Sequence, residues 1–188
     1  MIRKGARCGT TRVKSIVTRT GDEGQTGLMY NRRVPKNHPR VEACGAVDEL
    51  NAALGLARAT ATDERIREQL LALQNELVAL MGELATVPED LPRYLSEGHS
   101  QVTEPWSARL AQLAKASQTR GLAPRGWATP GRNLHAATLD LARTVCRRAE
   151  RQVCGLGEAA QLENKQILVY LNRLSDLLWL WAREGEAE

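Results

Sequence analysis

Four arginines and one glutamate crowd the nine-residue stretch from 143 to 151, near the C-terminal end of the chain. Arg143, Arg147 and Arg151 are spaced four residues apart, so a helix turning about 100° per residue puts them on one face with Glu150. Guanidinium groups one turn apart repel each other unless an anion lies among them, and their forked donors suit carboxylate and phosphate oxygens. The spacing predicts either a site for an acidic or polyphosphate partner or a basic face that only meets water.

The helix that carries these arginines must also bury a stripe. Leu134, Ala137, Leu141 and Val145 fall opposite the arginine row, and we expect them to face the core.

A second stretch that could do chemistry lies near the N-terminus, at residues 16–30. Three glycines, three threonines and an aspartate predict a loop rather than a helix. Glycines let backbone N–H groups point at an anion, and threonine hydroxyls can donate to phosphate. Neither a Walker A sequence nor a GxGxxG sequence is present. The composition fits a phosphate-binding loop and an ordinary surface loop equally well.

Apolar residues at helical spacing predict the elements that hold these two stretches. Five helices are expected over residues 40–60, 63–86, 103–116, 133–153 and 162–183, with non-helical connections at 87–102 and 120–132. Asp63 is the expected N-cap of the second helix, and Pro105 fits the first turn of the third. The sequence therefore predicts an all-α bundle of five helices preceded by a glycine-threonine loop.

Composition limits the class of protein. The chain has 188 residues, 43% hydrophobic and 26% charged, with no phenylalanine, which suits one domain with an aliphatic helical core at residues 16–188. Residues 1–15 are basic and without acids, and we expect a disordered extension. A net charge of +4, with acids among the arginines, argues against a nucleic-acid-binding protein. No apolar run approaches the ~20 residues of a membrane span.

Histidines and cysteines give little support to a resident metal or a thiol nucleophile. A di-metal bundle needs Glu-x-x-His pairs, and none of the three histidines follows a glutamate by three. The four cysteines lack CxxC spacing, so we expect free thiols in a reducing, cytoplasmic compartment. Cys146 lies among the arginines, which could lower its pKa, but a packed apolar role is expected.

Three stretches in order resemble one family. They are TRTGDEGQTG at 18–27 followed by RVPK at 33–36, RVEACGAVDELN at 40–51, and ARTVCRRAER at 142–151 with YLNRLSDLL at 170–178. The chain resembles the PduO-type ATP:corrinoid adenosyltransferases from about residue 16 to residue 183.

The resemblance implies a five-helix, ferritin-like bundle that assembles as a homotrimer with active sites between subunits. It implies transfer of the 5′-deoxyadenosyl group of ATP to Co(I) of cobalamin, giving adenosylcobalamin and triphosphate, with Mg²⁺ on the ATP phosphates and no clear protein ligand to the metal. A corrinoid reductase and an adenosylcobalamin-dependent enzyme are the implied partners.

Position by position, the resemblance also implies roles for single residues. Asp48 of one subunit would pair with Arg143 of its neighbour beside the corrinoid, and these two residues with Arg147 would be the catalytic set. The ATP contacts would be Thr18, Arg19, Thr20, Gly21, Thr26, Gly27, Lys36, Arg147, Arg148, Glu150, Arg151 and Asn172.

The chain departs from the family at WATPGR, residues 127–132, where the family has Phe-x-Leu-Pro-Gly-Gly. Trp127 stands in place of the phenylalanine that packs beneath the corrinoid ring and displaces the lower axial ligand. An indole is apolar and large enough for that role, although it adds an N–H donor. The alternative reading of Trp127 is a loop anchor. At the level of the whole chain, the alternative is a non-catalytic member of the same fold that binds ATP or delivers adenosylcobalamin.

Overall fold

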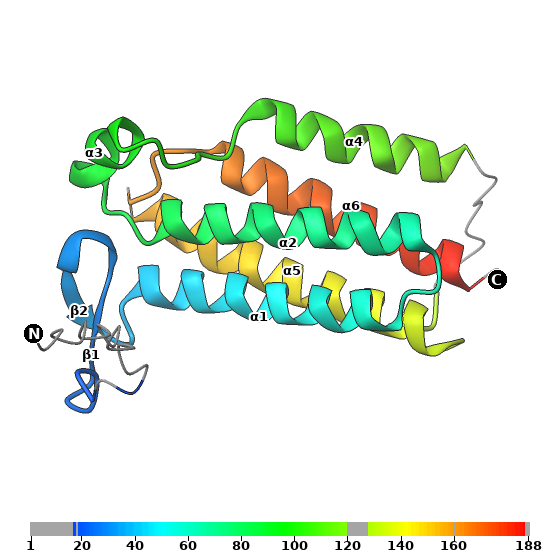
Figure 1. Cartoon of the computed structure of the whole chain (residues 1–188), viewed down its shortest axis with the longest axis horizontal. Coiled ribbons are helices and arrows are strands. Elements are labelled where there is room, and N and C mark those ends of the chain that lie inside the picture. The colour runs from blue at the N-terminus through cyan, green and yellow to red at the C-terminus, as the bar shows by residue number, and fades with distance from the viewer. Residues whose placement is uncertain (1–16, 18, 120–127, 160, 187–188) are drawn as a thin grey trace, which may run out of the picture.

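In the computed structural model the structure describes residues 17, 19–119, 128–159 and 161–186 (Figure 1). Within these ranges five long helices form a bundle, as the sequence predicts. A small antiparallel hairpin, which the sequence analysis did not predict, precedes them at the glycine-threonine loop. The five long helices are α1 (Pro39–Thr60), α2 (Glu64–Leu84), α4 (Glu104–Gln118), α5 (Leu134–Glu158) and α6 (Gln166–Gly185), and a short helix, α3 (Leu91–Ser96), lies between α2 and α4. The hairpin pairs β1 (Gln25–Gly27) with β2 (Arg33–Pro35), Thr26 opposite Val34.

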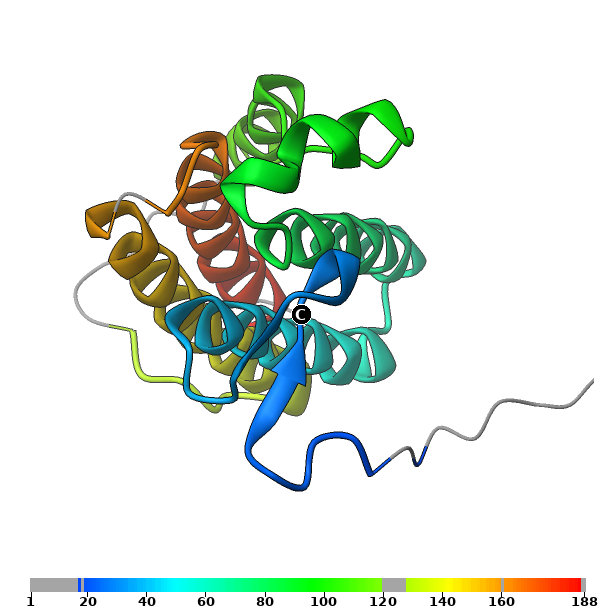
Figure 2. The ribbon, with the colours of Figure 1, turned by 90° about the vertical axis from the view of Figure 1, so that its left-hand side faces the viewer.

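The long helices pack side by side around one aliphatic core. Helix α1 packs against both α2 and α5, α5 packs against α6, and α6 packs against α4 (Figure 2). Leucine and alanine fill the space between them, and Leu50, Leu77 and Leu139 are fully buried. Among the described residues, no single helix is long and apolar enough to cross a membrane; α2 and the segment 88–96 would meet that criterion only together, across a 105° bend.

Several helix boundaries follow local signals. The Asp63 side chain caps α2 by accepting a hydrogen bond from the Arg65 N–H at 2.8 Å, as expected. Pro105 lies in the first turn of α4, also as expected. The expectation that residues 87–102 are non-helical is wrong, because α3 forms there with Tyr94 buried. Helix α6 begins later than predicted, since the Asn164 side chain accepts from the Gln166 N–H at 3.0 Å.

The predicted inward stripe of α5 is wrong for its two leucines, although Val145 is buried as expected. Leu134 is 70% exposed and Leu141 50% exposed, whereas Leu139, Ala142 and Cys146 are fully buried. At about 100° per residue, the buried face is rotated by roughly a quarter to a third of a turn from the predicted stripe. The reason is tertiary: α5 packs between α1 and α6, and their positions decide which of its faces is buried.

Arg40 joins three parts of the chain at the hairpin end of the bundle. Its guanidinium is buried, and it donates to the carbonyl oxygens of Leu84 at 2.7 Å, Thr86 at 2.9 Å and Gln161 at 2.5 Å. Leu84 is the last residue of α2 and Thr86 follows just after its end, where the helix itself offers no donors. Burial lowers the pKa of Arg40, so these carbonyl bonds offset part of the cost of hiding the charge.

We expect Arg40→Met to lower the free energy of unfolding by about 3 kcal/mol or more, because it leaves three carbonyls without their donor at about 1–3 kcal/mol each. Urea unfolding at one fixed protein concentration measures this. The exposed Arg65→Met is the matched control and should change the value by less than about 0.5 kcal/mol. A loss below about 1 kcal/mol in Arg40→Met would contradict the role of this guanidinium.

Candidate functional site

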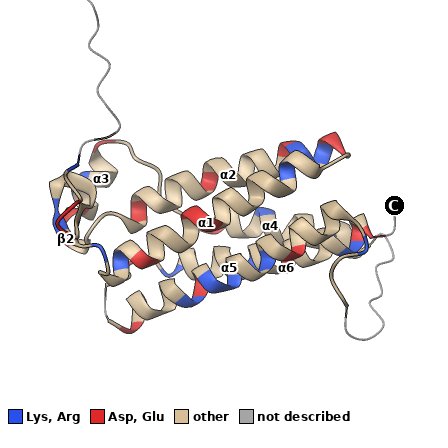
Figure 3. Cartoon of the chain, turned by 90° about the horizontal axis from the view of Figure 1, so that it is seen from below, with Lys and Arg blue, Asp and Glu red and all other residues tan. Residues whose placement is uncertain are grey.

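The arginine row lies along the middle of α5, on the outside of the bundle (Figure 3). Arg147 and Arg151 are exposed, and Arg143 is partly buried. Within the described part of the chain, neither Arg147 nor Arg151 forms an ion pair with a carboxylate, whereas their neighbours on the helix do. The two guanidinium groups are thus available to an external anion.

Arg143 is held from within its own chain. Its Nε donates to Asp140 Oδ1 at 3.1 Å, and the other oxygen of Asp140 accepts from Arg183 of α6. Asp140 and Arg183 are both buried, so this carboxylate joins the arginine row to the end of α6. Sequence reasoning missed Asp140, although an acid three residues before an arginine on a helix is a recognisable signal.

Arg148 reaches across to α1, where it forms an ion pair with Glu49. Both side chains remain about half exposed. The neighbouring Asp48 is exposed on α1. Within one protomer it does not pair with Arg143, which pairs with Asp140 instead. A single protomer therefore does not form the predicted Asp48–Arg143 pair, which the resemblance assigns to two subunits.

Two predicted ATP contacts meet between α5 and α6. The Asn172 amide donates to Glu150 Oε1 at 3.1 Å, and Arg173 donates to Asn172 Oδ1 at 3.1 Å. Beyond Arg173, a groove of about 610 Å³ runs between α4 and α6, lined in part by Lys115, Asp176 and Trp179.

The glycine-threonine loop and Lys36 also come together, through the hairpin. The Lys36 N–H donates to the Gly24 carbonyl at 2.9 Å, and a methyl group built on Gly21 would lie 3.1 Å from Lys36 Nζ. Arg33 adds a bond from its side chain to the Thr20 carbonyl at 2.8 Å. Gly24 has φ of 77°, which favours glycine, so the loop turns there to bring the Lys36 ammonium over Gly21.

The remaining predicted loop residues are accessible. Arg19, Thr20 and Gly27 are exposed and Thr26 is partly buried in β1, while Thr18 lies outside the described residues. The contacts that hold the hairpin are with the end of α2 and with α3, whereas the arginines lie on α5. The two halves of the predicted ATP site therefore belong to separate parts of the protomer.

Trp127, the predicted corrinoid contact, lies outside the described residues. Gly131 has φ of 113°, which explains a glycine at that position of the WATPGR stretch. Nothing in the structure explains Arg132, which is exposed.

Metal-ligating side chains and the thiol of Cys146 are the last features of this region. Among the described residues, no three His, Cys, Asp or Glu side chains gather in a way that could hold a metal ion. Cys146 is buried, and burial raises its pKa by more than the charge of Arg147 lowers it. Its Sγ donates to the Leu171 carbonyl at 3.2 Å, so it packs between α5 and α6 as expected.

Comparison with known proteins connects these features. The family model for cobalamin adenosyltransferases matches residues 16–184. The corrinoid adenosyltransferase PduO of Salmonella typhimurium is 42% identical over 178 residues, which are 93% of this chain and 50% of that protein. This chain thus spans about half the length of that relative, and 49% of the PduO of Citrobacter freundii.

Other relatives match over most of their length. The cobalamin adenosyltransferase of Cupriavidus metallidurans is 41% identical over 180 residues, covering 92% of this chain and 88% of that protein. A variant PduO-type ATP:corrinoid adenosyltransferase from Lactobacillus reuteri, solved in complex with cobalamin and ATP, superposes with a TM-score of 0.81 at 31% identity, covering 92% of this chain and 94% of that chain. With its helical bundle, its glycine-threonine loop and its arginine row, this chain belongs to the cobalamin adenosyltransferase family.

Proposed function

We propose that this protein transfers the 5′-deoxyadenosyl group of ATP to the cobalt of a Co(I) corrinoid such as cob(I)alamin and releases triphosphate. The observation that carries the proposal is the pair of guanidinium groups on α5, Arg147 and Arg151, which lack a carboxylate partner among the described residues. Family membership supports the same reaction, since the Lactobacillus reuteri relative was solved with both ATP and cobalamin.

The nucleotide would bind at the glycine-threonine loop. The exposed backbone near Gly21 and the Lys36 ammonium beside it offer N–H donors and a positive charge to phosphate oxygens. Thr18, Arg19, Thr20, Thr26 and Gly27 would complete this half. The Glu150–Asn172 pair would contribute from the other half.

The triphosphate would lie against Arg147, Arg148 and Arg151. Mg²⁺ would neutralise further phosphate charge, and it prefers phosphate oxygens and water with one or two carboxylates. The described residues fit that arrangement, because Glu150 offers a carboxylate on α5 between Arg147 and Arg151 in the sequence.

No side chain of the protein needs to act as a nucleophile in this reaction. Co(I) is a strong nucleophile: its electron pair forms the cobalt–carbon bond to C5′ of ATP, and the C5′–O bond breaks with its pair leaving on triphosphate. The protein must align C5′ with cobalt and stabilise the charge that builds on the leaving group. A row of guanidinium groups and one ammonium suit the second task. Trp127 would pack under the corrinoid ring and exclude a lower ligand.

Assembly as a homotrimer would bring the two halves of the site together. One exposed face of the protomer favours burial against another copy, because Leu56 of α1 is 47% exposed and Leu141 of α5 is 50% exposed. Leu56 and Leu141 lie at similar positions along the bundle axis, since Thr60 contacts Thr138 at 3.0 Å and Glu49 pairs with Arg148. Asp48 is exposed on α1 near this face, where it could meet Arg143 of a neighbouring copy.

Residence in the cytoplasm is part of the proposal, because Cys44, Cys146 and Cys154 are free thiols, as expected in a reducing compartment. A corrinoid reductase upstream and an adenosylcobalamin-dependent enzyme downstream would be its partners. The second candidate function is non-catalytic binding of ATP or delivery of adenosylcobalamin on the same fold.

Incubation with ATP, Mg²⁺ and chemically reduced cobalamin distinguishes the two. We expect the Co(I) absorbance to be replaced by that of adenosylcobalamin, with one triphosphate released per cobalt–carbon bond. ATP binding without formation of that bond would overturn the enzymatic proposal and favour the delivery role.

For Arg147→Ala we expect kcat/KM to fall about 100-fold, because a donor to the departing triphosphate is lost. The thermal midpoint and the oligomeric state should match the unaltered protein. Arg65→Ala, an exposed arginine on α2, is the matched control and should retain activity. A well-folded Arg147→Ala protein with a near-normal rate would argue against the triphosphate role.

For Asp48→Asn we expect either a several-fold higher KM for the corrinoid or a trimer that dissociates at higher protein concentration, since the charge that would meet Arg143 is removed. Steady-state kinetics and analytical ultracentrifugation measure the two effects. Glu68→Gln removes an exposed acid from α2 and should change neither. Unaltered kinetics together with unaltered assembly would exclude the cross-subunit pair.

A further inference from the structure

The hairpin that carries the nucleotide loop is too small to be stable by itself. Each strand has three residues, and isolated two-stranded hairpins are at best marginally stable in water. The loop at Gly21 and the ammonium of Lys36 move with this hairpin, because Lys36 follows β2 directly and bonds back to Gly24. Whatever holds the hairpin therefore decides where the phosphate-binding groups lie.

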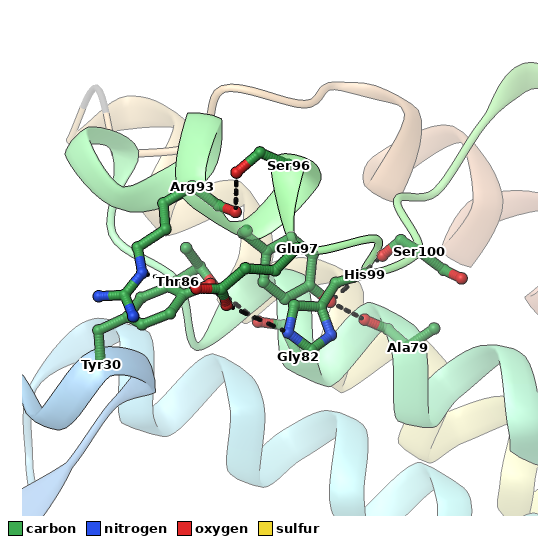
Figure 4. A network of polar contacts seen from close by, with 10 residues as sticks. Tyr30, Ala79, Gly82, Thr86, Arg93, Ser96, Glu97, His99 and Ser100 are labelled. Carbon is green, nitrogen blue, oxygen red and sulfur yellow. Dashed lines mark hydrogen bonds and ion pairs between the residues drawn. The ribbon is translucent and has the colours of Figure 1, made fainter.

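The contacts that hold it come from the segment between α2 and α4. The Met29 N–H donates to the Ala85 carbonyl at 2.9 Å. Arg32 forms a two-pronged pair with Asp90, with N–O distances of 2.7 and 2.8 Å. The third contact is made by Tyr30, whose hydroxyl donates to Glu97 Oε2 at 2.9 Å (Figure 4).

Tyr30 occupies an unfavourable backbone conformation to make this contact. It has φ of 56° and ψ of 31°, and Asn31 follows with φ of 63°. With the Arg32 N–H bonded to the Met29 carbonyl at 3.3 Å, these two residues are the centre of a type I′ turn. Such turns favour Asn and Gly, and a bulky residue there is an outlier that persists when the surroundings require it.

The contacts of the Tyr30 side chain hold the residue in this conformation. The Arg93 guanidinium lies over its ring at 4.1 Å from the centroid, and Arg93 Nε also donates to Glu97 Oε1 at 2.8 Å. Glu97 thus accepts from both partners, and the bonds from Arg93 and Tyr30 lower its pKa. An exposed ion pair contributes little to stability by itself. Here the Tyr30 phenol, the Arg93 guanidinium and the Glu97 carboxylate each contact the other two, so they form a network.

The segment carrying Arg93 and Glu97 is itself anchored to the bundle. Tyr94 is buried and its ring stacks on His99 at 4.6 Å, while its hydroxyl donates to the Ser100 carbonyl at 3.2 Å. A methyl group built on Gly82 of α2 would lie 2.7 Å from that hydroxyl, so only glycine there lets Tyr94 approach α2.

We propose that Tyr30, Arg93 and Glu97 form a clamp that positions the nucleotide loop for ATP. The three are positioning residues, because they act on ATP through the hairpin and not by contact. This inference rests on the proposed role of the loop in binding ATP.

The sharpest test is Tyr30→Asn, which removes the clamp and places a residue that the turn prefers. We expect the thermal midpoint to stay the same or rise slightly, while the KM for ATP rises about five- to tenfold. The KM for the corrinoid should change less than twofold. Glu97→Gln should give a smaller rise in the same KM, since the ring contact of Arg93 remains.

Glu64→Gln is the matched control, because it breaks an equally exposed pair with Arg67 (3.5 Å) at the far end of α2. Gly82→Ala is an independent variant that leaves the clamp residues intact but displaces Tyr94, and it should raise the KM for ATP in the same way. If Tyr30→Asn and Glu97→Gln leave the KM for ATP within twofold of the unaltered protein, the proposal is overturned.

Hydrogen exchange without any ligand separates this proposal from the proposed function. Amides of residues 21–36 should exchange faster in Tyr30→Asn and Glu97→Gln than in the unaltered protein, and amides of α5 should not. This holds even if the unaltered protein forms no cobalt–carbon bond, in which case calorimetric titration with Mg-ATP replaces the KM. Unaltered exchange, or faster exchange with unaltered ATP affinity, would refute the clamp.

Discussion

One buried guanidinium holds the end of the bundle to which the nucleotide loop is attached. Arg40 takes the carbonyls of Leu84 and Thr86, and the hairpin takes the carbonyl of Ala85 between them through the Met29 N–H. Carbonyls at a helix end must find donors elsewhere when they are buried. The carbonyls at the C-terminal end of α2 are therefore bound partly by Arg40 of the bundle and partly by the hairpin. The position of the hairpin thus depends on the end of α2.

A buried carboxylate of α2, beside this turn, holds the segments that lead into α4 and α6. Glu83 accepts from the Val102 N–H at 2.8 Å and from the Asn164 amide at 2.8 Å, so one side chain of α2 fixes the segments that enter α4 and α6. The Asn164 side chain also accepts from the N–H of Gln166, the first residue of α6. Because α6 begins at a fixed point, Asn172 comes level with Glu150 two turns later, where the candidate site joins α5 and α6.

The four arginines of α5 differ in whether a carboxylate of the same chain pairs with them. Asp140 holds Arg143, and Glu49 holds Arg148, while Arg147 and Arg151 have no such carboxylate in the described part of the chain. A helix with alternating compensated and uncompensated arginines can bind an anion without disrupting its own packing. The same division explains how α5 tolerates four arginines, since two are paired with carboxylates and the other two are exposed to solvent.

The residue types and their spacing were enough to predict the helical bundle, the arginine row on one helix face and the glycine-threonine loop, because these depend on local periodicity and turn chemistry. The face that α5 buries was not predictable, since it depends on where α1 and α6 lie against it. Nor could the sequence indicate α3, the Asp140–Arg183 pair or the clamp around Tyr30. Those arise from contacts between residues as much as 67 positions apart, as between Tyr30 and Glu97. Only the folded chain brings such residues within hydrogen-bonding distance, and local sequence preference for the Tyr30 turn even opposes the result.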